Sequence, residues 1–225
     1  MPLAIFDIDG TLIDSTAVDT RCFLDAFVAE FGVDASGVDP CAIVHYTDRG
    51  IVIDLFREFW SREPDEADIS RHRSRYLAKL KESAGVIPEI AGARAFVGEL
   101  RRRGWSVALA TGAWRQSALL KLAAAGFGDD MPLACCDDLV AREDIVRAAI
   151  VLAGETDPPV ILFGDGVWDV RCAANLRLPI VGIGRGAVAE QLRLAGARVI
   201  IDDFADTGTV FAAMENACGR QASSE

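Results

Sequence analysis

The stretch AIFDIDGTLIDS, residues 4–15, places two carboxylates, Asp7 and Asp9, one residue apart in a run of apolar side chains. In a strand, residues i and i+2 point to the same face, so both carboxylates would project together if the strand extends that far. At about 4 Å and an effective dielectric near 20, they would repel by about 4 kcal/mol. The apolar neighbours therefore predict a buried strand, and the repulsion predicts that a proton or a cation offsets the paired charge.

A second pair of carboxylates follows another apolar run, LFGDGVWDV, at residues 162–170. Asp165 comes directly after the predicted strand, and Asp169 lies four residues later, one turn along a predicted helix. In a parallel sheet, the carboxyl ends of the strands meet at one edge. Asp7, Asp9, Asp165 and Asp169 could then collect there, and such a set of hard oxygen ligands is typical of a Mg²⁺ site. A metal-bridged phosphoryl group is the ligand that this site suggests.

Two further elements are suited to an anionic ligand. The run LATGAW ends a predicted strand with Thr111 and Gly112, which offer a hydroxyl and an open backbone amide ahead of a helix. Arg142 stands at the start of the helix in AREDIV, after another predicted strand. It is the best-placed cation in the second half of the chain for binding a phosphoryl oxygen.

From about residue 88 onward, short apolar runs alternate with helical patterns. Strands are predicted in WSVALATG, PLACC, PPVILFGDG and PIVGIGRG. This alternation predicts an α/β fold, with a Rossmann-like parallel sheet covered by helices on both faces. Residues 16–86 instead carry helical patterns with no obvious strand, so we expect a helical cap domain there. The core domain would then comprise residues 1–15 and 87–225.

These motifs, in this order, resemble those of the haloacid dehalogenase superfamily, and most closely its phosphoglycolate-phosphatase-like subgroup with a helical cap. The first motif is Asp7 to Thr11, the second includes Thr111, and Gly164 to Asp169 is similar to the fourth. Arg142 stands where the third motif usually has lysine. Its planar guanidinium is not equivalent to a lysine's point charge, so the sequence departs from the family pattern at this position.

The resemblance implies a role for each residue. Asp7 would attack phosphorus and form an aspartyl-phosphate, and Asp9 would act as general acid and then as general base. Mg²⁺ would be held by Asp7, the Asp9 backbone carbonyl, Asp165 and Asp169. Phosphoryl oxygens would be bound by Thr111, Gly112 and Arg142.

Asp9 also discriminates among activities in this superfamily. Its dehalogenases and phosphonatases lack the second aspartate, so its presence implies phosphoryl chemistry. A Mg²⁺-dependent phosphatase acting on a small phosphorylated metabolite is the main hypothesis. A sugar-phosphate mutase, or a catalytically silent binding module on the same fold, remains open as an alternative.

Two residues of the predicted cap, Arg49 and His72, carry side chains that could serve a function. Arg49 follows a predicted turn and could reach the substrate's leaving group from a cap loop. His72 lies in the charged run SRHRSRY, which predicts a solvated helix face.

The 225-residue chain carries a formal net charge of -11, which argues against nucleic acid as a partner. Its first residues lack the basic and apolar regions of a signal peptide, and no apolar run has the length of a membrane span. We therefore expect a cytoplasmic protein without membrane association. The sequence does not indicate an oligomeric state.

Overall fold

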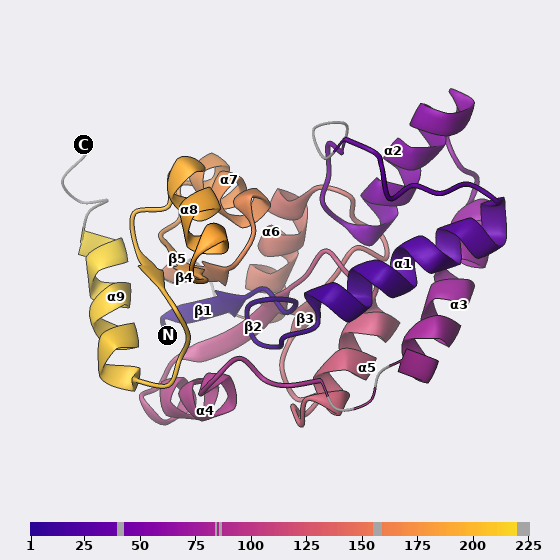
Figure 1. The fold of residues 1–225 in the computed structure, drawn as a ribbon. Coiled ribbons are helices and arrows are strands. Elements are labelled where there is room, and N and C mark those ends of the chain that lie inside the picture. Colours follow the sequence, from indigo (N-terminus) through magenta and orange to yellow (C-terminus); the bar gives the residue numbers. More distant parts are fainter. Residues whose placement is uncertain (40–42, 84, 86, 155–158, 220–225) are drawn as a thin grey trace.

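The computed structural model describes the chain except residues 40–42, 84, 86, 155–158 and 220–225. Its centre is a parallel sheet with strand order β3-β2-β1-β4-β5-β6 (Figure 1). The strands are β1 (Leu3–Phe6), β2 (Ser106–Ala110), β3 (Leu133–Ala134), β4 (Val160–Gly164), β5 (Ile180–Ile183) and β6 (Ile200–Ile201). The α/β class and the parallel sheet predicted from the sequence are confirmed.

The helices account for most of the remaining described chain. They are α1 (Thr16–Phe31), α2 (Asp48–Trp60), α3 (Glu66–Ser83), α4 (Ala93–Arg102), α5 (Arg115–Ala124), α6 (Arg142–Leu152), α7 (Val167–Leu176), α8 (Ala187–Leu194) and α9 (Thr207–Gly219). Among the described residues, these helices are too short or too polar to cross a bilayer.

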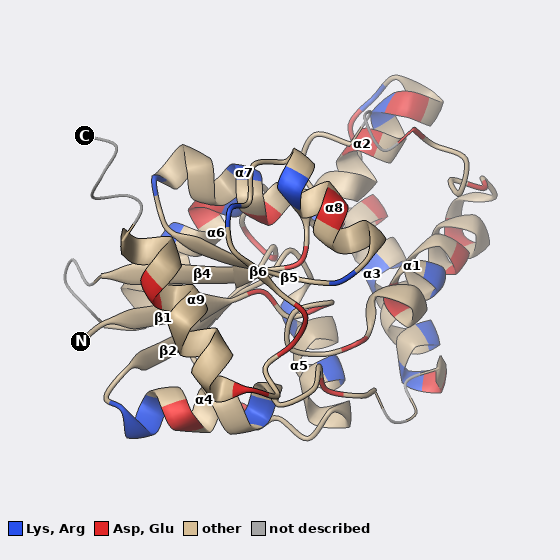
Figure 2. Ribbon diagram, turned by 60° about the vertical axis from the view of Figure 1, so that its left-hand side comes forward, with Lys and Arg blue, Asp and Glu red and all other residues tan. Residues whose placement is uncertain are grey.

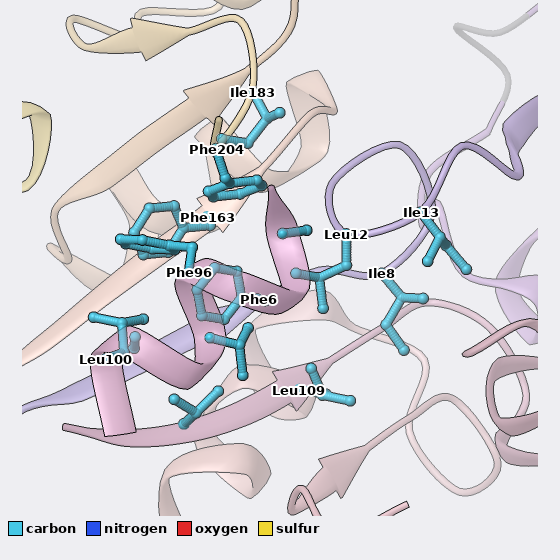
Figure 3. Packing of buried hydrophobic residues seen from close by; sticks show 14 of the residues in the cluster. Phe6, Ile8, Leu12, Ile13, Phe96, Leu100, Leu109, Phe163, Ile183 and Phe204 are labelled. Carbon is cyan, nitrogen blue, oxygen red and sulfur yellow. The ribbon is translucent and has the colours of Figure 1, made fainter. Parts of the chain in front are cut away.

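Strand β1 lies in the middle of the sheet and is buried on both faces. Ala4 and Phe6 belong to the apolar cluster under α4, α5 and α9, whereas Leu3 and Ile5 face the cluster under α6 and α7. On the first face, the Phe6 ring stacks on Phe163 of β4 with ring centroids 4.4 Å apart (Figure 3). Burying a side chain of this size stabilises the fold by roughly 1.5–3 kcal/mol. Because both faces are covered, the strand is apolar at every position, as in other parallel sheets.

The sequence did not predict β6. This strand is two residues long, in ARVIIDD, and pairs with β5 at the edge of the sheet. A two-residue strand has too few positions to show an alternating or continuous apolar pattern.

Helices α1, α2 and α3, here called the cap helices, lie to one side of the sheet (Figure 1). The described residues between 16 and 83 form helices and loops without a strand, as expected. The apolar residues of the cap helices join the cluster on one face of the sheet, and Trp114 is fully buried at the junction. Its indole stacks on the ring of Phe23 at 6.1 Å.

The prediction of a solvated face at His72 is wrong. His72 is fully buried on α3, and its Nε2 atom lies 3.1 Å from the carbonyl oxygen of Phe23. It shares a helical stripe with Tyr76 and Leu80, which are also buried. The arginines around it point outward: Arg71, for example, is half exposed and pairs with Glu30. Figure 2 shows acidic and basic residues interspersed along the cap helices.

Candidate active site

The predicted site residues follow three neighbouring strands at the carboxyl edge of the sheet. Asp7 follows β1, Thr111 follows β2 and Asp165 follows β4. Strand β1 pairs with both β2 and β4, so these three positions lie next to one another. After β1, the chain first adds β2 and β3 on one side of β1, and it later adds β4, β5 and β6 on the other side. Ligands of open parallel sheets bind at such a switch in strand order.

Asp7 lies just beyond the end of β1, and it is 7 % exposed. Its backbone N–H donates to the carbonyl oxygen of Phe163 at 2.9 Å, which continues the ladder with β4 by one residue. Its carboxylate oxygen Oδ1 lies 3.1 Å from Nη2 of Arg142. Burial raises the pKa of Asp7 to about 7, although Arg142 opposes this shift. The structure thus brings Arg142 to Asp7.

Arg142 is also ion-paired with Asp169, through a direct contact of Nη2 with Oδ1. The other carboxylate oxygen of Asp169 accepts a hydrogen bond from Gly166 N–H at 3.0 Å, which fixes the start of α7. Burial lowers the pKa of Arg142, but Asp169 and Asp7 outweigh this and raise it above its usual value. The guanidinium is therefore a fixed positive charge between two acidic groups.

Asp7, Asp165 and Asp169 form an acidic cluster, in which one oxygen from each carboxylate lies within 4.8 Å of the others. Burial raises the pKa of Asp165 well above its ordinary value, and Asp7 and Asp169 raise it further. Thr11 Oγ1 donates to Asp165 Oδ1 at 3.3 Å. Crowded, partly buried carboxylates with one arginine between two of them form a donor set that suits a hard divalent cation. The residues therefore fit the expected Mg²⁺.

Asp9 has different partners from Asp7. Strand β1 ends at Phe6 and its ladder with β4 continues only to Asp7, so the alternation of a strand does not extend to Asp9. The Asp9 carboxylate accepts hydrogen bonds from Ser15 Oγ and from Lys121 Nζ, the latter at 2.7 Å. Its side chain is not part of the acidic cluster. The two aspartates thus have different direct partners, although the charge of Asp9 contributes to the raised pKa of Asp7.

Lys121 is the main residue of the site that the sequence analysis missed. It is fully buried on α5 and also forms an ion pair with Asp19, which accepts a hydrogen bond from Tyr76. Burial lowers the pKa of Lys121, but Asp9 and Asp19 outweigh this and raise it. The signal was present in RQSALLKLAAAG, because Lys121 lies on the same helical stripe as the buried Ala118 and Leu122.

Thr111 and Gly112 directly follow the carboxyl end of β2. Thr111 is buried, and its Oγ1 accepts a hydrogen bond from Ala113 N–H at 3.1 Å. The Gly112 carbonyl oxygen accepts from Asp48 N–H at 2.7 Å, which ties the start of α2 to the core. A Cβ atom at Gly112 would lie 2.6 Å from the Tyr46 carbonyl oxygen and 2.7 Å from Arg142 Nη1. A side chain at this position would displace either the cap or the arginine.

A cavity of about 350 Å³ opens between the carboxyl edge of the sheet and the cap helices. It brings together predicted residues from separate parts of the chain, and its lining includes Asp7, Asp9, Thr111, Gly112, Arg142 and Asp165. Asp169 lies behind Arg142 and lines a small adjoining cavity instead.

Arg49 is not brought into the cavity. Its guanidinium pairs with Glu66 and donates to the carbonyl oxygen of Asp137 at 3.3 Å. It is absent from the lining formed by the described residues. Arg49 lies in the first turn of α2, and its side chain points toward α3, where it forms the ion pair with Glu66.

Comparison with known proteins identifies the family of this chain. A model of the haloacid dehalogenase-like hydrolases matches residues 1–177, which include every residue of the acidic cluster and Arg142. The chain belongs to this family. The resemblance inferred from the sequence motifs is therefore confirmed, since the match covers most of the chain.

Individual relatives cover nearly the whole chain. Phosphoglycolate phosphatase from Agrobacterium fabrum is 29 % identical over 211 residues, which are 91 % of this chain and 89 % of that protein. Among solved structures, CbbY from Rhodobacter sphaeroides in complex with phosphate has a TM-score of 0.71 at 24 % identity, over 92 % of this chain and 96 % of that one. A hydrolase from Pseudomonas syringae has a TM-score of 0.76 at 20 % identity, over 94 % and 98 %. The structural matches share the fold with this chain.

Proposed function

We propose that the protein is a Mg²⁺-dependent phosphatase that hydrolyses a small phosphate monoester through an aspartyl-phosphate. The observation that carries this proposal is that Asp7 and Asp9 line one cavity but have different partners. Asp7 lies beside Arg142 and the acidic cluster, whereas Asp9 is bound by Ser15 and Lys121. We propose that the first carboxylate attacks phosphorus and that the second transfers a proton. The similarity to a phosphoglycolate phosphatase supports phosphate monoesters as the substrate class.

In this proposal, Asp7 is the nucleophile. Its carboxylate attacks phosphorus as the bond to the leaving alcohol breaks, and Asp9 donates the proton that the alcohol needs. Asp9 then accepts a proton from the water that hydrolyses the aspartyl-phosphate, which returns both residues to their starting states. Arg142, together with Thr111 and the Gly112 N–H, would bind the phosphoryl oxygens and offset their charge.

Asp7, Asp165, Asp169 and the backbone carbonyl of Asp9 would hold the Mg²⁺. When bound, the metal supplies positive charge that offsets repulsion between the phosphoryl group and the carboxylates. Arg142 does not replace this charge, because it already lies between Asp7 and Asp169.

The test measures phosphate release from an aryl phosphate such as 4-nitrophenyl phosphate, with Mg²⁺ and with a chelator. We expect activity that depends on Mg²⁺, complete loss in Asp7→Asn, and a loss of at least a hundredfold in Asp9→Asn. Circular dichroism and thermal unfolding confirm that each variant is folded. Normal turnover in folded Asp7→Asn would contradict the assignment. Absence of turnover over a broad panel of phosphate esters would favour a silent binding module instead.

A further inference from the structure

The cavity has two chemically different ends. At the sheet edge, its lining is polar and consists of the residues described above. On the cap side, its lining contains the apolar side chains of Phe23, Leu24, Ala35, Val38, Ile43, Ile51 and Leu55, together with the uncharged hydroxyl side chains of Thr16, Thr20 and Ser36. A phosphate monoester bound with its phosphorus near Asp7 would extend its organic part toward this second end. We refer to that end as the apolar end of the cavity.

Positive charge is confined to the other end. Among the described residues that line the cavity, the basic side chain is Arg142, and it is already paired with Asp7 and Asp169. Lys121 lies behind the lining, where Asp9 and Asp19 hold its ammonium group. Neither cation is placed to bind a second anionic group at the apolar end.

Three of the polar side chains between the two ends, Asp19, Thr47 and Asp48, already have partners. Asp19 is bound by Lys121 and Tyr76, and Asp48 accepts a hydrogen bond from Trp114 N–H at 3.0 Å. Burial raises the pKa of Asp48 well above its ordinary value, which favours its neutral form. Thr47 Oγ1 donates to the carbonyl oxygen of Val140 and accepts from Gly50 N–H. These groups therefore have little need of a charged or strongly hydrogen-bonding ligand.

A flat aromatic surface borders the cavity where the cap meets the core. Tyr46, ahead of α2, stacks on Trp168 of α7 with centroids 4.5 Å apart and ring planes 18° apart. Both residues belong to the cavity lining. Because the stack joins the cap to the core, it gives an apolar ligand a rigid wall.

From this lining we infer that the substrate's leaving group is an uncharged, largely apolar alcohol or phenol. The inference rests on the proposed phosphatase function and narrows its substrate class. An apolar group would replace water against the apolar side chains of this end. A carboxylate or a second phosphate would instead lose its hydration without gaining a cation. Esters such as phosphoglycolate, whose leaving group carries a carboxylate, are therefore disfavoured substrates.

Three matched esters test this inference. They are 4-methylpentyl phosphate, 4-(phosphonooxy)butanoate and the corresponding terminal amidinium ester, which share chain length and terminal branching but differ in terminal charge. Phosphate release with Mg²⁺ gives kcat/KM for each. We expect the neutral ester to exceed both charged esters by at least tenfold, a difference of about 1.4 kcal/mol in the transition-state free energy. The preference should persist in 0.5 M NaCl, which screens the long-range effect of the net charge of -11.

A cation placed at the apolar end should change this preference. Leu24→Arg puts a guanidinium on the cavity side of α1, and Val28→Arg, one turn later on an exposed position, is the matched control. We expect Leu24→Arg to raise the carboxylate-to-neutral ratio of kcat/KM by at least tenfold, and Val28→Arg to leave it unchanged. Thermal unfolding confirms that both variants are folded. If Leu24→Arg does not fold, Leu24→Gln provides a smaller polar change and should lower kcat/KM for the neutral ester alone.

The outcomes separate this inference from the proposed function. Equal or faster hydrolysis of the carboxylate ester by the wild-type protein would overturn the inference of an apolar leaving group. It would leave the phosphatase assignment intact. Preference for the amidinium ester would do the same and would indicate that Asp19 and Asp48 bind a cation. Failure to hydrolyse any ester would overturn the proposed function, and the inference with it.

Discussion

The ammonium group of Lys121 lies 2.7 Å from the carboxylate of Asp9, in a site where the lysine is fully buried. The contact joins α5 of the core to the turn after β1. Asp19 of α1 binds the same ammonium group, so a single lysine connects the proposed acid/base residue with a cap helix. A buried lysine is stable here because two carboxylates surround it.

We predict that Lys121→Met lowers the free energy of unfolding by about 3 kcal/mol or more. The methionine fills a similar volume, but it leaves Asp9 and Asp19 facing each other without the cation, and breaking a buried ion pair typically costs about 3–5 kcal/mol. Urea unfolding of the variant and the wild type measures the difference. Lys81→Met, at an exposed position on α3, is the control and should change stability by less than about 0.5 kcal/mol.

Removing a partner carboxylate should reduce this loss. We expect the double variant Asp19→Asn with Lys121→Met to be more stable than the sum of the two single effects predicts, by about 1 kcal/mol or more, because the substitutions remove both charges of one pair. The same unfolding experiments give this coupling energy. Strict additivity would show that the Lys121–Asp19 contact is not a stabilising interaction.

Arg142 offers a second prediction, about catalysis. We expect Arg142→Met to lower kcat/KM on an aryl phosphate by about a hundredfold to a thousandfold, because Asp7 and an arriving phosphoryl group lose their nearest fixed cation. Arg142→Lys should retain more activity, since a lysine supplies the charge without the planar pair of donors. Arg147→Lys, an exposed residue five positions later on α6, is the matched control and should behave like the wild type. Equal activities for all three variants would remove Arg142 from the site.

Part of the candidate site could be predicted from the sequence, because a parallel sheet brings residues that are far apart in the chain to the same edge. Asp7, Thr111 and Asp165 each follow an apolar run, and a parallel sheet brings such positions to one edge. Arg142 follows the same logic as the first residue of α6. Its Nη2 lies 3.1 Å from Asp7, and this arginine stands where the resembling motif usually has lysine. Its role in binding phosphate stays a prediction.

The remaining contacts depend on how helices pack, and local sequence does not determine that. The partner of Arg49 is Glu66, on a different helix, and this pair directs the arginine away from the cavity. Lys121 meets Asp9 across 112 positions of sequence. His72 is buried because it lies on the same helical stripe as Tyr76. The arginines around it made the segment resemble a solvated helix face in the sequence.

Gly10 gives a third prediction, about the geometry of the turn after β1. Its φ is +79°, and a Cβ atom there would lie 1.9 Å from Oδ2 of Asp165. We expect Gly10→Ala to reduce activity by more than a hundredfold, because either the turn or the acidic cluster must move. Gly32→Ala tests conformation alone, since Gly32 has a similar φ of +73° and open space around it. It should cost about 1 kcal/mol of stability and leave activity unchanged.

The last prediction concerns stability at acidic pH, where His72 contributes. Burial lowers the pKa of His72 to about 4, although the Phe23 carbonyl oxygen opposes this shift. In the unfolded chain, the imidazole regains its ordinary pKa of 6.5. Between these values, the unfolded chain binds a proton that the folded chain does not, so the free energy of unfolding rises with pH through this window. Acidification from pH 7 to pH 4 should therefore remove about 3 kcal/mol through this residue.

Urea unfolding of the wild type and of His72→Gln at several pH values isolates the contribution of His72 to the pH dependence of the free energy of unfolding. Titrating carboxylates also contribute to the pH dependence, but they are common to both proteins, so the difference between the two curves reports His72. We expect the wild type to lose about 3 kcal/mol more than His72→Gln between pH 7 and pH 4. Parallel curves for His72→Gln and the wild type would mean that His72 takes up its proton without unfolding, and that its buried position in α3 tolerates the charge.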